Sequence, residues 1–402
     1  MTKLIGRMWP TAGKTALILT LLSPAPAIAE PDLILDARLR YESVDQDGLA
    51  NSADALTLRT RVGVDSGPLG DFRFLIEAEN VIHLVDDFNS TTNGNAGYPV
   101  VADPEETELN RVQLAYTGLP GTTVTLGRQR VILGDARYVG NVGFRQNEQT
   151  FDALRVTHVG IENLTLNYLY LDRANRIFGD DHPAGEWDLD AHLVSADAAT
   201  PAGTLSGFAY LVENQDAAAL STATYGVRWQ GRIATGDGPV IAYFAEYAHQ
   251  SSYGNNPASF DLNLFRAQAS VAHNGFSAAL GLENLEGDGV RGFATPLATL
   301  HAYQGWADVF LNTPASGIRD LYVRGGWTAQ DPPFGQGLSA AVIVHSFEAQ
   351  NGGGDLGSEI DAVVTARLTD HWSLELKGAF YDGPTGGPAG RDKIWLALTV
   401  SY

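Results

Sequence analysis

The amino-acid sequence predicts an all-β fold, a transmembrane antiparallel β-barrel of about 18 strands. Segments of about ten residues alternate apolar and polar side chains, as expected for strands with one face toward lipid and the other toward an aqueous interior. Short and long connections follow one another along the chain. No apolar run reaches the roughly 20 residues that a membrane-spanning helix needs.

The alternation predicts strands at residues 33–43, 55–66, 71–85, 107–117, 122–132, 150–159, 164–173, 188–198, 204–213, 221–234, 239–250, 261–273, 275–286, 317–329, 337–348, 357–368, 371–381 and 392–402. Gly and Pro in turns such as 118–121 and 200–203 supply the backbone angles of tight turns. An even number of strands puts all short turns on one side of a membrane and all long connections on the other. An apolar stretch at 302–312 would make the number odd, so we expect it in a long loop.

The first 29 residues are typical of a secretory signal peptide. A positively charged start precedes a short apolar run at 16–22 and the small-residue cleavage site Ala27-Ile28-Ala29. Residues 30–402 contain no internal linker. We therefore expect a signal peptide at 1–29 and a single barrel domain at 30–402.

The last predicted strand has apolar side chains at alternate positions and ends on the aromatic Tyr402. Such an end is similar to the closing strand of Gram-negative outer-membrane barrels, which the barrel-assembly machinery reads. We expect the bacterial outer membrane as the location, with membrane lipid and the assembly machinery as partners. The alternative is an ordinary terminal edge strand.

Composition excludes other classes of protein. The chain has no cysteine, so disulfides play no part. Its formal net charge is −21, and residues 30–402 alone carry 23 basic against 47 acidic side chains. Such an acidic chain is not expected to bind nucleic acid.

The cations of the predicted barrel are almost all arginine, with only Lys377 and Lys393 as lysines after residue 29. The arginine side chain offers a planar donor fork that fits carboxylates and sugar oxygens, so the bias favours a lined channel. On the lipid face, an arginine at the membrane midplane would cost about 2–4 kcal/mol. Nine arginines are predicted to face the lumen and contact an anionic solute: Arg59, Arg61, Arg73, Arg111, Arg128, Arg137, Arg145, Arg155 and Arg228.

The same arginines have a structural interpretation. Glu77 and Glu79 share the predicted face of Arg73. Opposite charges on neighbouring strands stabilise a sheet by roughly 0.2–1 kcal/mol per pair. For any one arginine, pairing with a lumen carboxylate is as well supported as contact with a solute.

Two loops stand out. Residues 127–152 hold several arginines and amides where an outer loop would use Lys, Ser and Glu, so we expect this loop to fold into the lumen and form a hydrogen-bonding constriction. Residues 301–320 place Trp306 and Phe310 between Gly and Pro residues. Large apolar groups in such a loop are expected to pack on the barrel wall or on a neighbouring loop.

Both stretches resemble the alginate-export family of porins. The matching motifs are Gly127-Arg128-Gln129, Arg137, Val139-Gly140, Arg145-Gln146-Asn147, Phe151-Asp152, Gly305-Trp306-Ala307-Asp308, Phe310-Leu311, Thr313-Pro314, Gly317 and Asp320. The resemblance runs over nearly the whole chain from Arg38 to Tyr402. It implies an 18-stranded, monomeric outer-membrane channel with an arginine-lined lumen that favours anions, such as alginate-like uronates or small carboxylates.

Other functions find weak support. The nine histidines show no metal-ligand spacing, and no nucleophile, base and orienting group can be assembled, so we predict neither a metal site nor an enzyme. The loop tips 286–289 and 351–355 carry clustered oxygens that would suit Ca²⁺, the one cofactor considered. A non-conducting structural or adhesive barrel is the main alternative, and a barrel enzyme a weaker one.

Overall fold

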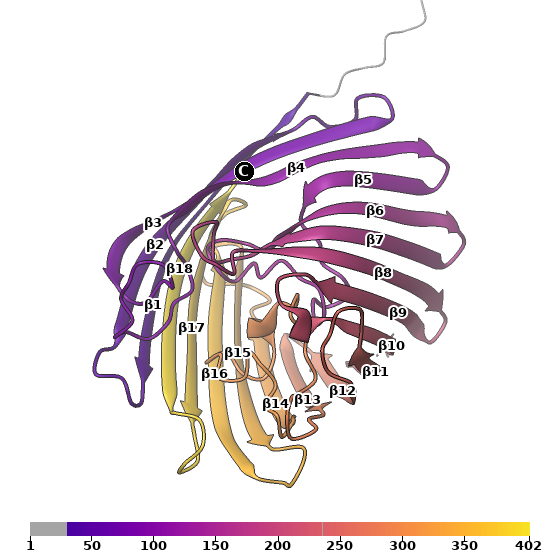
Figure 1. Ribbon diagram of the computed structural model, residues 1–402. Helices are drawn as coiled ribbons and strands as arrows, with labels where there is room; N and C mark the ends of the chain where they lie inside the picture. Colours follow the sequence, from indigo (N-terminus) through magenta and orange to yellow (C-terminus); the bar gives the residue numbers. More distant parts are fainter. Residues whose placement is uncertain (1–29, 235) are drawn as a thin grey trace, which may run out of the picture.

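Eighteen antiparallel strands form one sheet that closes on itself, because β1 pairs with both β2 and β18 (Figure 1). The computed structural model describes residues 30–234 and 236–402, so the predicted signal peptide lies outside the described residues. The predicted fold class is confirmed.

The first nine strands are β1 (Asp32–Gln46), β2 (Ala53–Asp65), β3 (Phe72–Asp87), β4 (Glu106–Leu119), β5 (Thr122–Gln129), β6 (Thr150–Ile161), β7 (Leu164–Asn175), β8 (Glu186–Thr200) and β9 (Gly203–Asn214). The second nine are β10 (Thr222–Ala234), β11 (Val240–Ser252), β12 (Asp261–His273), β13 (Phe276–Leu285), β14 (Ile318–Thr328), β15 (Gly337–Glu348), β16 (Asp355–Arg367), β17 (Trp372–Asp382) and β18 (Arg391–Ser401). Two 3-10 turns, η1 (Ala218–Leu220) and η2 (Leu300–Ala302), lie in connections. Each predicted strand is found, and the stretch 302–312 lies in a loop as expected.

The two faces of each strand differ as the alternation predicted. On β1, Leu33 is 74% exposed on the outer face, whereas Arg40 is 2% exposed on the inner face. The closing pair with β18 continues the outer face, with Leu39 opposite Leu398. An apolar belt outside and a polar wall inside are the pattern of a barrel in the bacterial outer membrane.

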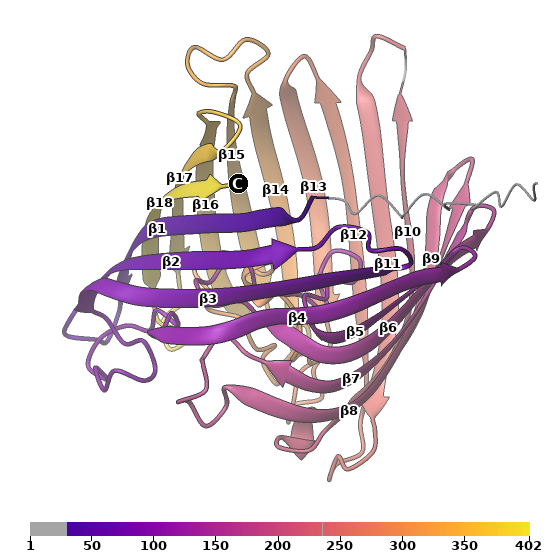
Figure 2. The same ribbon diagram turned by 90° about the horizontal axis from the view of Figure 1, so that it is seen from above.

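The two ends of the barrel are unequal (Figure 2). Tight turns such as 120–121 and 162–163 join strands at one end, which also holds both chain ends of the barrel. At the other end lie the long connections, above all 88–105, 130–149 and 286–317. In outer-membrane barrels the short turns face the periplasm and the long loops face outward. No helix among the described residues is long and apolar enough to cross a membrane.

The interior is filled by inward-folded loops. Val131, Leu133 and Tyr138 from the β5–β6 loop pack against Leu171 and Leu193 on the inner wall. A barrel of this size would otherwise hold a wide aqueous passage. The loops therefore decide the shape of the lumen.

Candidate functional site

The candidate site is the lumen, which two loops narrow. The β5–β6 loop (residues 130–149) and the β13–β14 loop (residues 286–317) pack inside the ring of strands (Figures 1 and 2). They touch through Gly140 N–H and Gln149 Nε2, which donate to the carbonyl oxygen of Leu297 at 2.9 and 3.0 Å. The prediction that the first loop folds into the lumen is confirmed.

One buried ion-pair cluster holds both loops on the wall of β1 and β18. Asp308, from the β13–β14 loop, accepts from Arg145 Nη2 at 3.0 Å and from Lys393 Nζ at 2.7 Å. Arg145, from the β5–β6 loop, also donates to Glu42 at 3.2 Å. Burial alone would raise the pKa of Asp308, but His301, Lys393 and Arg145 hold it well below its usual range.

A second cluster surrounds Glu148 near the wall of β2 to β4. Arg130 donates to both carboxylate oxygens, at 2.7 and 2.5 Å, and Asn110 Nδ2 donates at 2.7 Å. Arg61 Nη2 lies 3.7 Å away. Burial alone would raise the pKa of Glu148, but Arg61 and Arg130 outweigh burial and lower it to about 2. Glu148 is therefore ionised in the folded protein at neutral pH.

A third cluster lies on the wall of β10 to β12. Glu246 accepts from Arg228 Nε at 2.5 Å, Arg266 Nη2 at 2.9 Å and the Tyr138 hydroxyl at 2.9 Å. Asp135, in the β5–β6 loop, pairs with the same two arginines at 2.8 and 2.9 Å. Each of these cations therefore has at least two carboxylate partners.

Lys377 on β17 is held without a carboxylate. Its Nζ lies 2.6 Å from Nε2 of His301, whose Nδ1 lies 2.7 Å from Asp308. The ammonium also lies over the Trp306 ring, 3.7 Å from its centroid, and Phe144 stacks on the imidazole. Burial lowers the pKa of His301 to about 3, so the ring is neutral and its Nε2 accepts a hydrogen bond from the lysine ammonium. As predicted, Trp306 packs on the wall.

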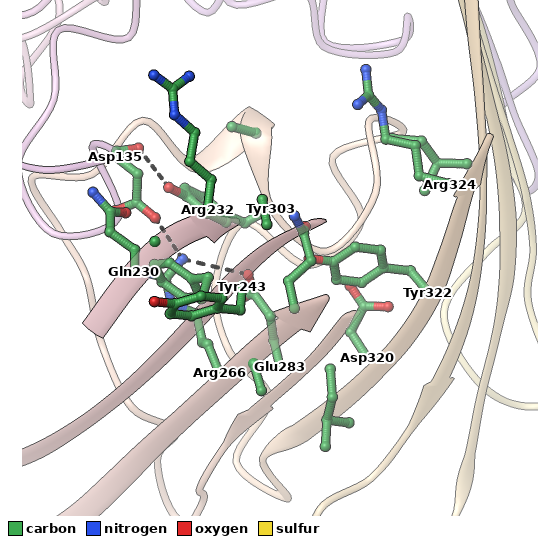
Figure 3. Close-up of a pocket in the computed structure, with 18 of the residues that line it drawn as sticks. Asp135, Gln230, Arg232, Tyr243, Arg266, Glu283, Tyr303, Asp320, Tyr322 and Arg324 are labelled. Carbon is green, nitrogen blue, oxygen red and sulfur yellow. Dashed lines mark hydrogen bonds and ion pairs between the residues drawn. The ribbon is translucent and has the colours of Figure 1, made fainter. Parts of the chain in front are cut away.

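The periplasmic half of the lumen contains a cavity of about 850 Å³ between β10 to β15 and the underside of the loops (Figure 3). Asp135 and Glu283 flank Arg266 in its lining, at 2.9 and 3.6 Å. Arg232 and Arg324 also line the cavity but, within the described residues, have no ion-pair partner. Asp320, a further acid of the lining, pairs with His345 at 2.9 Å. The unpaired charges of this lining are thus both cationic.

A second cavity of about 430 Å³ lies on the outward side of the loops. Its lining is more apolar and includes Trp187, Phe260 and Phe310. Arg176 lies over the Trp187 ring at 3.6 Å, and Arg291 lies over the Phe260 ring at 4.7 Å. Burial lowers the pKa of Arg176 to about 10.

The structure places eight of the nine predicted arginines inside the barrel. Six of these lie on the inner wall and two, Arg137 and Arg145, lie in loops: Arg59, Arg61, Arg73, Arg111, Arg137, Arg145, Arg155 and Arg228. All but Arg155 have a carboxylate partner within 4 Å among the described residues. Most of the predicted set therefore builds the wall, and its contact with a solute stays a prediction.

The predicted lumen position of Arg128 is wrong, because the structure places this residue on the outer face. It stands opposite Val112 on β4 and Asp152 on β6, and it alternates with the buried Gln129. This register turns Arg128 to the outer face, where its Nε donates to Asp152 at 2.9 Å. Because Arg128 lies near the long-loop end of β5, its charge can stay in the interfacial region instead of the lipid core.

Replacing Arg128 with alanine is therefore expected to leave ion selectivity unchanged. The loss of its partly exposed pair with Asp152 should reduce the free energy of unfolding by about 0.2–1 kcal/mol. Reversal potentials of the Arg128→Ala variant in a salt gradient check this result. A shift as large as that of a lumen variant would contradict the outward placement.

Several lumen cations were not among the predicted contact residues: Arg38, Arg40, Arg232, Arg266, Arg324, Lys377 and Lys393. Arg38 and Arg40 share the polar face of β1 with Glu42, as the alternation of the first predicted strand indicates. Arg38 donates to Gln146 at 2.8 Å and to the carbonyl of Gly143 at 3.1 Å, so it holds the β5–β6 loop. No group of three or more His, Cys, Asp or Glu side chains that could hold a metal ion occurs within 30–234 and 236–402. Binding of Ca²⁺ at the loop tips 286–289 and 351–355 stays a prediction.

The closed sheet and its polar lumen define the class of protein as an outer-membrane β-barrel. The chain is similar to OpdL of Pseudomonas aeruginosa, with 17% identity, a TM-score of 0.67 and coverage of 93% of this chain and 99% of that chain. It is also similar to OccAB2 of Acinetobacter baumannii, with 16% identity, a TM-score of 0.70 and coverage of 92% and 98%. For OccK2 (OpdF) of P. aeruginosa the identity is 14% and the TM-score is 0.71, with coverage of 93% of this chain and 98% of that chain.

These structures share the barrel fold with this chain over more than nine-tenths of its length. At these identities the similarity shows the fold alone. No protein-family model and no curated protein matches the sequence. The similar structures share the barrel fold and do not single out the alginate-export family.

Proposed function

We propose that this protein is a passive outer-membrane channel for anionic solutes, either small carboxylates or acidic saccharides such as uronates. The observation that carries the proposal is the unpaired charge in the 850 Å³ cavity. Arg232 and Arg324 are exposed there without an ion-pair partner among the described residues, whereas the acids of the same lining are paired. A hydrated anion finds free donors in this cavity and a cation finds no free carboxylate.

The paired arginines support the proposal in another way. Arg59, Arg61 and Arg228 are neutralised by carboxylates, so they do not hold an anion tightly. Conduction needs favourable entry together with binding weak enough for release. A few free cations in a wall of paired ones meet both conditions.

The sequence motifs resembling alginate-export porins support uronates as solutes and one chain as the working unit. The β1–β18 pair closes the barrel within a single chain, so the wall needs no second copy. Direction of transport follows the solute gradient in a passive channel.

A non-conducting barrel is the second candidate, because the inward loops fill much of the lumen. The enzyme alternative finds less support. His301 and His345, the buried histidines of the lumen, are held by Asp308 and Lys377 and by Asp320 and Asp361. These contacts give both rings a structural role.

Conductance of the refolded protein in a planar bilayer tests the proposal. In a KCl gradient the reversal potential should move toward the chloride potential, and uronate oligomers should interrupt the current. Replacing Arg232 and Arg324 together with alanine should lower the anion-to-cation permeability ratio by roughly threefold, because the free cations of the cavity are gone.

The matched control removes two arginines from the outer face, Arg173 and Arg319, which pair with Glu186 and Glu348. The control has the same net charge as the lumen variant and should keep wild-type selectivity. Equal shifts of the reversal potential in both variants, or a preference for K⁺ over Cl⁻ in the wild type, would make the anion assignment wrong. A silent wild-type barrel would support the non-conducting alternative.

A further inference from the structure

The two cavities of the lumen meet at one side chain. Gln304, in the β13–β14 loop, is the residue that appears in the lining of both the 850 Å³ and the 430 Å³ cavity among the described residues. Its side chain is 4% exposed. Arg137 lines the outward cavity and Glu283 lines the periplasmic one. Gln304 therefore stands in the layer that separates the two spaces.

A continuous hydrogen-bonded bridge crosses this layer. Arg137 Nη2 donates to Gln304 Oε1 at 3.2 Å, and Gln304 Nε2 donates to Glu283 Oε2 at 2.5 Å. The amide satisfies a cation on one side and a carboxylate on the other with its two different atoms. The Gln304 side chain is the central member of this bridge.

The backbone on either side of Gln304 is fixed. Trp306 N–H and Ala307 N–H donate to Asp361 and Glu359 of β16, at 3.2 and 2.7 Å. A Cβ on Gly305 would lie 2.3 Å from the Glu359 carboxylate, and the φ of +81° at this residue also favours glycine. The Gln304 residue itself has a φ of +52°, which a non-glycine residue adopts only where its surroundings hold it. The part of the layer that is free to rotate is the Gln304 side chain.

Arg137 has an unused donor at this point. Its Nε is buried and has no hydrogen-bond partner, although Glu283 lies 3.7 Å away. The guanidinium is 1% exposed and lies over the Tyr303 ring at 4.5 Å. Nε and Nη2 form one edge of the guanidinium fork, the edge that binds a carboxylate through two parallel bonds. At present Gln304 takes one of these two donors.

We propose that the Gln304 side chain is the gate between the two cavities and occupies the place of the solute's anionic group on Arg137. A carboxylate that enters from the outward cavity displaces the amide oxygen and takes both donors of the Arg137 edge. The displaced side chain then rotates aside and joins the two cavities. This inference rests on the proposed function, and it identifies Arg137 as the residue that binds the carboxylate group of the solute.

Single-channel recording tests the gate. The Gln304→Ala variant should raise conductance by roughly twofold or more and increase chloride preference, because the bridge is gone and Arg137 Nη2 has lost its acceptor. The Gln304→Glu variant keeps the size of the side chain and fixes an acid on Arg137. It should keep the narrow layer and lose anion preference and uronate block.

The control is Gln336→Ala, since Gln336 is exposed in the periplasmic turn 329–336. It should conduct like the wild type. A conducting wild type with an unchanged Gln304→Ala variant would overturn the gate and leave the proposed function standing. A closed wild type with a conducting Gln304→Ala variant supports the gate. Silence in both would overturn the channel and the gate together.

Discussion

The Asp308→Ala variant is expected to lose about 3–5 kcal/mol of unfolding free energy, because removing one partner of a buried ion pair leaves uncompensated charge. Asp308 accepts from Arg145 at 3.0 Å, from Lys393 at 2.7 Å and from His301 at 2.7 Å. Without it, two buried cations face each other across the contact between the loops and the wall. The β13–β14 loop should then detach from β18, and channel conductance should rise.

Denaturant unfolding of the refolded barrel in detergent, followed by tryptophan fluorescence, measures the loss of stability. Asp288→Ala is the matched control, because Asp288 lies in the same loop, is exposed and accepts only the N–H groups of Val290 and Arg291. The control should unfold like the wild type. Equal stability of the two variants would mean that the Asp308 cluster does not hold the loop.

Acidification is expected to weaken the packing of the β5–β6 loop through Glu148. Its pKa is about 2 in the folded protein, against a usual value of 4.5. A carboxyl whose pKa is lower in the folded state stabilises the fold above its unfolded pKa and loses that contribution as pH falls toward the folded pKa. The contribution should therefore be complete above about pH 5 and lost between about pH 4.5 and pH 2, with a size of about 3 kcal/mol.

Unfolding free energies of the wild type and the Glu148→Gln variant, measured from pH 7 to pH 2, isolate this effect from other carboxyl groups. The variant should be less stable at pH 7, and the two curves should converge near pH 2. Glu162→Gln, in the exposed turn 162–163 between β6 and β7, is the control and should follow the wild type at every pH. A constant difference between wild type and Glu148→Gln would show that the ionisation of Glu148 is not the cause.

His301 adds to the acid sensitivity over a range that begins at a higher pH and overlaps that of Glu148. Burial lowers its pKa to about 3, so the folded protein keeps the ring neutral while the unfolded chain takes up a proton below about pH 6.5. Stability is lost as pH falls from 6.5 toward 3. The two loops that shape the lumen are therefore both held by groups that lose stabilising free energy in acid.

The wall of the barrel was predictable because its physics is local. A strand turns successive side chains to opposite faces, so Leu33 and Arg40 had to face different solvents whatever the rest of the chain did. The polar loop at 130–149 was predictable from its composition. Arg61 was placed in the lumen by the alternation of its strand, and Arg145 by the composition of its loop.

Arg128 was misplaced although its strand alternates regularly, because Val124, Leu126 and Arg128 share one face and Leu126 is 60% exposed on it. The cost of an arginine in lipid favoured the lumen, but this cost is small near the end of a strand. Lys377 and Lys393 were overlooked because their partners, His301 and Asp308, lie in a loop some 80 residues away in sequence. No local pattern links residues so far apart.

The sequence by itself determined the closed barrel, the number of strands, the apolar outer face and the arginine-rich inner face. These follow from a side-chain period of two residues and from the unequal cost of charge in lipid and in water. The tertiary structure alone decided which cations are neutralised, which remain free at Arg232 and Arg324, and where Gln304 divides the lumen. Ion pairs and cavities depend on distances of a few ångströms between loops and wall, and only the folded chain sets those distances.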